Sequence, residues 1–175
     1  MLTPAQEKWI AHLSDEKRVE IIPFNSACAD LFETVKNDIA CKLSPTLLLE
    51  HHGASSLGIS GQDEIDAYLP VAADKFDETV RLVETLYGEP QSYYAAERAR
   101  FVTVLRGKHI DIFVINNECS GWKDGVRFEN YLRTHPTTLK QYEKLKESVA
   151  GQSVRAYYRE KIEFINQILA TAKNF

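Results

Sequence analysis

The sequence lacks the long apolar runs, the basic excess and the leader sequence that define several large classes of protein. No window approaches the roughly 18 consecutive apolar residues of a membrane-spanning helix, so we expect no association with a membrane. A net charge of −4 and a pI near 5.8 argue against general nucleic-acid binding, because phosphate contacts require a basic surface. The N-terminus lacks the basic start and apolar middle of a signal peptide, which predicts a cytoplasmic protein.

Two further absences argue against particular kinds of binding site. The three cysteines, Cys28, Cys41 and Cys119, are widely spaced and form no CxxC or Cys/His metal pattern, so we interpret them as structural thiols. The motif GxxxxGK[ST] is also absent, which excludes a P-loop. What remains is a chain of 175 residues with 44% hydrophobic and 26% charged residues, a composition typical of a globular domain.

The most informative stretch covers residues 51–71, in which a small-residue loop leads directly into an acidic strand. The apolar segment Pro45–Glu50 predicts a short strand before the loop. In residues 64–69, acidic or polar residues alternate with Ile65, Ala67 and Leu69, which is the period-two pattern of a strand with one apolar face. Glu64 and Asp66 therefore project from the same side of this strand.

Periodicity and turn residues predict the other elements. Further strands are expected over residues 18–24, 92–95, 99–106 and 108–115, with Gly107 in the turn of a hairpin formed by the last two. Helices are expected from Pro4 and over residues 27–42, 74–87, 124–134, 137–150 and 153–173. The prediction is an α+β fold in which helices flank a mixed sheet. A single domain over residues 1–175 would have a helical extension at 1–17 and a C-terminal helical cap from about 121.

A third acid, on a later strand, strengthens the case for a site. Asp111 lies in the middle of the apolar strand 108–115, where a carboxylate is unfavourable to bury unless something pairs with it. A magnesium ion bound by Glu64, Asp66 and Asp111 would satisfy that requirement and align a nucleoside triphosphate. One of the carboxylates would accept a proton from an attacking hydroxyl. The alternative for Glu64 is a solvated residue at a sheet edge.

The residues around the acids suggest phosphate contacts. Gly53, Ser55 and Ser56 offer backbone amides and hydroxyls that suit a phosphate, although the same residues also occur in ordinary turns. His109 shares the face of Asp111 and is a candidate ligand contact. Lysines and arginines cluster in sequence around the acidic strands, and some of them could meet phosphates: positions 98, 100, 106, 108, 123, 127 and 133. We interpret the aromatic residues of the C-terminal part as packing residues: Trp122, Phe128, Tyr131 and Tyr142.

Four segments resemble one family: HHGASSLGISGQDEIDAYLPV, HIDIFVIN, FENYLRTHPTTLKQYEKLKES and VRAYYREKIEFINQIL. Together they are similar to the GrpB family, a branch of the polymerase-beta-like nucleotidyltransferase superfamily, from about Val19 to Leu169. The resemblance implies a nucleotidyltransferase-like fold and a triphosphate loop at Gly53, Ser55 and Ser56. It also implies a first acid pair at Glu64 and Asp66 and a third acid at Asp111.

These observations predict a magnesium-dependent enzyme that moves a nucleoside monophosphate from a nucleoside triphosphate to an unknown acceptor bearing a hydroxyl. The C-terminal helices would form part of the acceptor pocket, with Arg133, Lys146 and Lys161 as candidate anion contacts. Two alternatives remain open. One is a non-catalytic nucleotide-binding or protein-interaction module with the same fold, and the other is a phosphatase or nuclease that uses the same acids.

Overall fold

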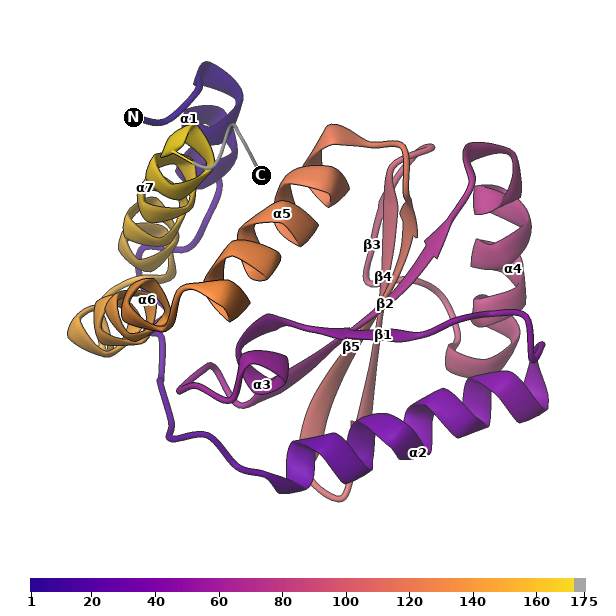
Figure 1. Cartoon of the computed structure of the whole chain (residues 1–175). Coiled ribbons are helices and arrows are strands. Elements are labelled where there is room, and N and C mark those ends of the chain that lie inside the picture. The colour runs from indigo at the N-terminus through magenta and orange to yellow at the C-terminus, as the bar shows by residue number, and fades with distance from the viewer. Residues whose placement is uncertain (172–175) are drawn as a thin grey trace. The chain divides into compact units, whose positions relative to one another are not determined.

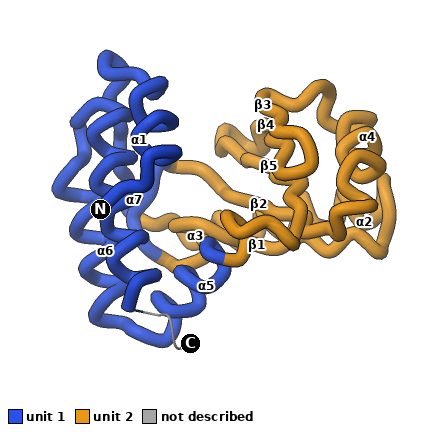
Figure 2. The backbone as a smooth tube through the Cα atoms, turned by 90° about the horizontal axis from the view of Figure 1, so that it is seen from above, with its two compact units in different colours: residues 1–23, 59–62, 124–175 blue, residues 24–58, 63–123 orange. Residues whose placement is uncertain are grey.

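The computed structural model describes residues 1–171 and divides into two compact units, which are drawn in different colours in Figure 2. Unit 2 comprises residues 24–58 and 63–123 and contains the β-sheet. Unit 1 comprises residues 1–23, 59–62 and those from 124 onward. The N-terminal segment and the C-terminal helices thus belong to one unit, although they lie far apart in the sequence.

The elements follow one another along the chain as labelled in Figure 1. Those of unit 2 are α2 (Ala27–Lys42), β1 (Glu50–His52), α3 (Gly53–Leu57), β2 (Glu64–Val71), the 3₁₀-helix η1 (Ala73–Lys75), α4 (Phe76–Tyr87), β3 (Ser92–Tyr94), β4 (Arg98–Leu105) and β5 (Lys108–Asn116). Helix α5 (Ser120–Thr134) begins at the end of unit 2 and continues into unit 1. Unit 1 also contains α1 (Pro4–Ala11), α6 (Pro136–Ser148) and α7 (Val154–Thr171).

The sheet is mixed, as the sequence predicted. Its strand order is β1-β2-β5-β4-β3, with β2 and β5 parallel and the other neighbours antiparallel. The predicted β4–β5 hairpin is confirmed, because Leu105 pairs with Lys108 across a two-residue turn. Both turn residues, Arg106 and Gly107, have positive φ values of 51° and 80°, as the favoured hairpin turns require.

Three local predictions were wrong. The strand expected at Pro45–Glu50 starts only at Glu50, and the small-residue loop after it forms the short helix α3. Residues 18–24 make only isolated bridges, from Arg18 to Ser153 and from Ile22 to Gly61. The apolar pattern of that segment instead reflects packing within unit 1, where Val19 is buried against Val149 and Tyr157.

Most helix predictions were close to the observed bounds. Helix α2 matches its predicted range, and α1 begins after Thr3, whose side chain forms a capping box with Gln6. Helix α5 begins four residues earlier than expected, at Ser120, and the predicted end of the last helix at Lys173 lies outside the described residues. No helix within residues 1–171 is both long enough and apolar enough to cross a membrane.

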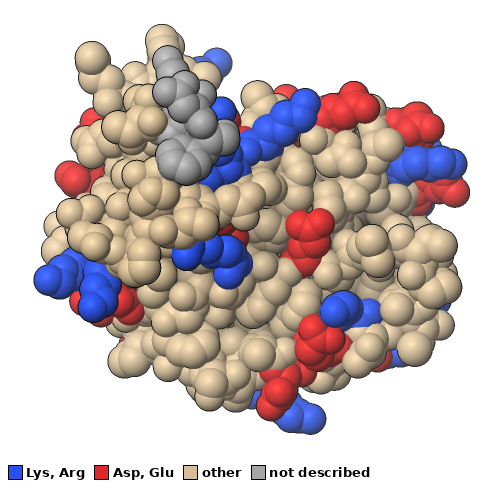
Figure 3. Space-filling model, in the orientation of Figure 1, with Lys and Arg blue, Asp and Glu red and all other residues tan. Residues whose placement is uncertain are grey.

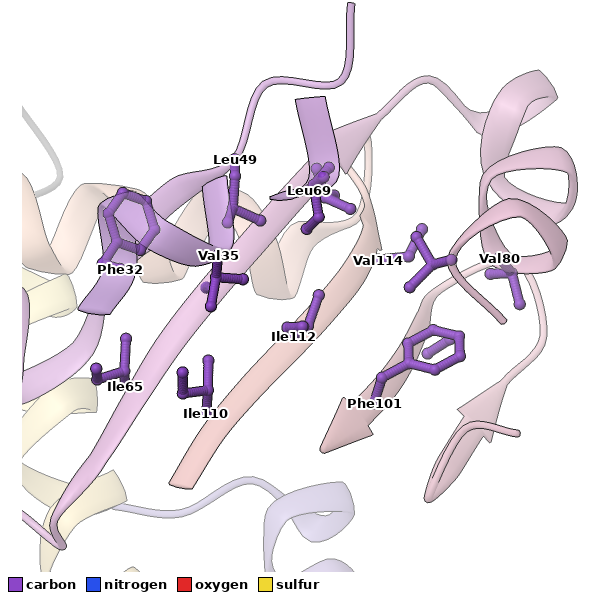
Figure 4. Packing of buried hydrophobic residues seen from close by; sticks show 14 of the residues in the cluster. Phe32, Val35, Leu49, Ile65, Leu69, Val80, Phe101, Ile110, Ile112 and Val114 are labelled. Atoms are coloured by element: carbon purple, nitrogen blue, oxygen red, sulfur yellow. The ribbon is translucent and has the colours of Figure 1, made fainter. Parts of the chain in front are cut away.

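The hydrophobic core of unit 2 lies between one face of the sheet and helices α2 and α4, and Figure 4 shows its packing. Strands β2 and β5 contribute buried residues at alternate positions: Ile65, Ala67, Leu69, Ile110, Ile112 and Val114. Helix α2 adds Leu31, Val35 and Ile39 at helical spacing. Cys28 is also buried in this core, as expected for a structural thiol, whereas Cys41 is exposed.

In unit 1, polar and aromatic contacts link α1 to α7. Glu7 on α1 accepts two hydrogen bonds from Arg159 on α7, at 2.8 and 2.6 Å, and Trp9 packs edge-on against Tyr158. Elsewhere in this unit, the rings of Phe128, Tyr142 and Phe164 pack together. Phe128 and Tyr142 are therefore packing residues, as the sequence predicted.

The hairpin turn provides a test of backbone strain. Arg106 has a left-handed backbone conformation, which asparagine tolerates better than arginine. We expect Arg106→Asn to raise the free energy of unfolding by roughly 0.5–1 kcal/mol in urea denaturation. Arg106→Ala is the matched control, because it removes the same charge without relieving the strain. Equal stability of the two variants would contradict this account.

Tyr87 provides a test of alkaline stability. Its ring packs against the core, and burial, together with the Asp38 carboxylate, raises the pKa of the phenol from 10.0 to about 12. Stability from the protonated phenol is thus fully present below pH 10 and is lost as the pH rises toward 12. We expect Tyr87→Phe to lose less stability than the unmodified protein between pH 9 and pH 11 in urea denaturation. Identical losses would show that Tyr87 does not contribute.

Candidate functional site

The face of the sheet opposite the α2–α4 core carries the predicted acids, and we call it the polar face. On β2 it presents Glu64, Asp66 and Tyr68, which alternate with the buried core residues of that strand. On β5 it presents His109, Asp111 and Phe113. Because side chains alternate between the two faces along both strands, one face of the sheet forms the core and the other carries polar and aromatic side chains.

The parallel pairing of β2 with β5 determines which of these residues are neighbours. Glu64 lies beside His109, Asp66 beside Asp111, and Tyr68 beside Phe113. The last pair is stacked, with ring centroids 4.5 Å apart, and the Trp122 ring lies 5.4 Å from that of Tyr68. The strand of Asp111 therefore does neighbour the acidic strand, as the sequence predicted, and the polar face continues from acids into aromatic rings.

Asp111 already has a cationic partner on the next strand. Arg100 on β4 donates from Nε to Oδ2 and from Nη2 to Oδ1 of Asp111, both at 2.9 Å. The Asp111 side chain is only 7% exposed, whereas that of Arg100 is 37% exposed. A bidentate guanidinium–carboxylate pair of this kind satisfies the buried carboxylate without a metal ion.

Gly53, the first residue of α3, lies against the carboxylate of Asp66. Its φ is +75°, and a Cβ added there would lie 2.0 Å from Oδ2 of Asp66. Both the backbone conformation and the close approach therefore require glycine at this position. Gly58 ends the same helix with a φ of +69°, but a Cβ there would meet nothing within 4 Å.

The predicted phosphate-binding hydroxyls make local hydrogen bonds. The Ser55 hydroxyl lies 2.9 Å from Nε2 of His51, whose ring stacks on Phe32. The Ser56 hydroxyl donates to the Gly53 carbonyl at 3.0 Å. The Ser56 hydroxyl would have to leave the Gly53 carbonyl to donate to a phosphate, and the contribution of the two serines to ligand binding remains a prediction.

The acids fit a magnesium ion only in part. No group of three or more His, Cys, Asp or Glu side chains within residues 1–171 is arranged to hold a metal ion. At Asp111, both carboxylate oxygens accept hydrogen bonds from Arg100. Glu64 and Asp66 share one face of β2, and magnesium is commonly bound by one or two carboxylates together with substrate phosphates. These two residues therefore match the donor set of such an ion.

Further ionisable side chains lie on β4, on β5 and just before β2. Lys108 forms an ion pair with Asp63, immediately before the acidic strand, and His109 is exposed at the start of β5. Arg98 lies over the rings of Tyr94 and Phe113. On the face of the molecule in Figure 3, basic and acidic side chains are interspersed.

The three basic residues predicted to bind anions belong to unit 1. The buried ammonium group of Lys146 donates to the Ser60 carbonyl, while Glu143 accepts from the Ser60 amide at 2.9 Å. The ammonium group of Lys161 lies over the rings of Tyr157 and Tyr158. Arg133 forms an ion pair with Glu129, in which Nη2 lies 3.7 Å from Oε2. Lys146 thus anchors the 59–62 segment to α6, and the anion-binding roles of all three stay predictions.

Sequence reasoning did not single out Arg100, which was one of seven basic positions near the acids. The useful signal was available in principle, because the hairpin register from Leu105 and Lys108 places Arg100 opposite Phe113, one position on the same face from Asp111. A hairpin register worked out from the turn would have identified this diagonal pair.

The sequence is similar to a known family and to proteins of two bacteria. The family model described as "GrpB protein" matches residues 18–171. A UPF0157 protein of Vibrio cholerae is 26% identical over 85% of this chain and 79% of its own length. The UPF0157 protein YqkA of Bacillus subtilis is 27% identical over 95% of this chain, which spans only 50% of the length of YqkA.

One solved structure is similar in fold. The crystal structure of the conserved protein GrpB from Enterococcus faecalis has a TM-score of 0.67, with 20% identity over 87% of this chain and 96% of that chain. The likeness supports the mixed sheet flanked by helices. The family match, which covers most of the sequence, shows that this chain belongs to the GrpB family.

Proposed function

We propose that the polar face binds a nucleoside triphosphate with magnesium and transfers the nucleoside monophosphate to an acceptor hydroxyl, as the resemblance to the polymerase-beta-like nucleotidyltransferase superfamily implies. The observation that carries the proposal is the register of the two parallel strands. It sets Asp66 directly beside Asp111, with Glu64 two residues away on the same face of β2. Family membership and the fold agree with this proposal, but neither specifies a reaction.

Each residue would have a distinct role in this reaction. Glu64 and Asp66 would hold the magnesium ion, which when bound supplies positive charge to the phosphates. The acceptor oxygen forms a bond to the α-phosphorus, the bond from that phosphorus to the bridging oxygen breaks, and pyrophosphate leaves. A carboxylate of the acid group takes the proton of the acceptor hydroxyl. Gly53 would allow the chain to approach the Asp66 carboxylate and the phosphates closely.

A second candidate is a module that binds nucleotide without turnover. The observation in its favour is that Asp111, Ser55 and Ser56 all make hydrogen bonds within the protein. Pyrophosphate release separates the two candidates. A screen of hydroxyl-bearing acceptors with each triphosphate, labelled at the α-phosphate, would yield pyrophosphate and a labelled acceptor from a transferase. A hydrolase would yield labelled nucleoside mono- or diphosphate with pyrophosphate or inorganic phosphate and no labelled acceptor, and a binding module would yield none of these products.

The carboxylates provide the first test. We expect calorimetry to show magnesium-dependent binding of a non-hydrolysable nucleoside triphosphate, and Asp66→Asn or Asp111→Asn to weaken it at least about tenfold, because each removes a negative charge from the site. Asp63→Asn is the matched control. Asp63 precedes the strand, pairs with Lys108 and has a positive φ that asparagine accepts. Unchanged binding in both site variants would disprove the proposed site.

The glycine provides the second test. Gly53→Ala would push a methyl group into the Asp66 carboxylate, so we expect loss of magnesium-dependent nucleotide binding. Gly58→Ala imposes a similar backbone strain at the end of the same helix without a clash, and should keep that binding while losing only the stability that the strain costs. Thermal unfolding of both variants measures the shared strain. Equal nucleotide affinity in the two variants would argue against a role for the Gly53–Asp66 contact.

A further inference from the structure

The pairing of Arg100 with Asp111 has the form of a phosphate-binding group that is engaged by a carboxylate. Two parallel N–H···O bonds of 2.9 Å join the planar guanidinium to the two oxygens of Asp111. A phosphate presents its oxygens to arginine in the same bidentate geometry. Arg100 could therefore exchange one oxyanion for the other without a change in the kind of bond it makes.

The neighbours of Asp111 explain why an arginine is needed in the absence of nucleotide. Asp66 lies beside Asp111 on β2, and Arg100 reaches it from β4 on the opposite side. Two adjacent carboxylates repel each other, and a carboxylate as buried as Asp111 is costly to leave unpaired. Arginine stays charged at any ordinary pH, so it balances the acids before a metal ion arrives.

Asp111 is more deeply buried than Arg100, and this difference would allow Arg100 to exchange Asp111 for another partner. The carboxylate of Asp111 is fixed in the interior, whereas more than a third of the Arg100 side chain is exposed. The guanidinium can therefore turn toward a ligand on the polar face while Asp111 stays in place. A divalent cation beside Asp111 would also repel Arg100, which favours its transfer to a phosphate.

We propose that Arg100 is a substrate-binding residue that changes partner: it holds Asp111 in the nucleotide-free protein and binds the triphosphate when nucleotide enters. Release of Asp111 then completes the acid group formed with Glu64 and Asp66. This inference rests on the proposed nucleotide-binding function and assigns Arg100 as the residue that binds the phosphates at that site. One consequence is that metal alone binds weakly, whereas metal and triphosphate bind cooperatively, because only the triphosphate provides an alternative partner for Arg100.

The test uses Arg100→Gln in the full chain with two probes, Mn²⁺ alone and a non-hydrolysable nucleoside triphosphate with Mg²⁺. We expect the variant to bind Mn²⁺ roughly tenfold more tightly, because Asp111 is released, and to bind the triphosphate roughly tenfold or more weakly. Paramagnetic resonance measures free Mn²⁺, and calorimetry measures the nucleotide. A residue that only maintained the fold would weaken both kinds of binding.

Arg98→Gln is the matched control, because Arg98 lies on the same face of β4 and its removal changes the net charge equally. Its Mn²⁺ affinity should rise much less than that of Arg100→Gln. The double variant Arg100→Gln, Asp111→Asn should lose the gain in Mn²⁺ affinity. If Arg100→Gln fails to fold, Arg100→Lys keeps the charge but not the fork, and the same opposite changes are expected in reduced size.

The possible results distinguish failure of the Arg100 exchange from failure of the proposed nucleotide-binding function. If the unmodified protein binds triphosphate but Arg100→Gln does not gain Mn²⁺ affinity over Arg98→Gln, the exchange is wrong and the nucleotide site stands. If Arg100→Gln gains Mn²⁺ affinity but keeps full triphosphate affinity, Arg100 does not bind phosphate and the proposal also fails. If the unmodified protein binds no triphosphate with Mg²⁺, the proposed function and the inference fail together.

Discussion

The central parallel pair of strands must bury apolar side chains on one face while it holds carboxylates on the other, and the rest of unit 2 follows from this constraint. Ile65 and Ile110 are fully buried against the α2–α4 side, so their sequence neighbours have to face the opposite way. A shift of one residue in either strand would place its acid in the core. The hydrophobic core therefore determines where the acids stand.

Charge balance is the second consequence of this arrangement. The register brings Asp66 and Asp111 side by side, which is unfavourable unless cations lie near them. Arg100 supplies one positive charge through two short hydrogen bonds. In the proposed function, the same pair would also control whether Asp111 is available to a ligand. Stability and the proposed function depend on one contact, which is why opposite effects on metal and triphosphate binding are informative.

The fold and the function rest on different kinds of support. A structure at 20% identity establishes the architecture that this chain shares with a GrpB protein, and the family match extends over residues 18–171. The proposed activity would depend instead on a few positions at which one substitution leaves the architecture intact, such as Gly53 beside Asp66.

Several features could be predicted from local periodicity and turn chemistry alone. The range of α2, the β4–β5 hairpin around Gly107 and the common face of Glu64 and Asp66 were all predictable, because each depends on residues close together in the chain. The mixed sheet was predicted from the same patterns, and the family resemblance implied it as well. Local pattern failed at residues 18–24, where the apolar residues serve packing in unit 1 and not a ladder.

Only the tertiary structure decided the partners of the charged groups. Alternation shows which face Asp111 occupies, but the bond to Arg100 depends on the register of a different strand, and the contact of Gly53 with Asp66 depends on how α3 turns back over β2. Lys146 likewise binds the Ser60 carbonyl, 86 residues away in the chain. Such pairings arise when distant segments pack together, and a carboxylate that looked in sequence like a metal ligand is held in the fold by an arginine.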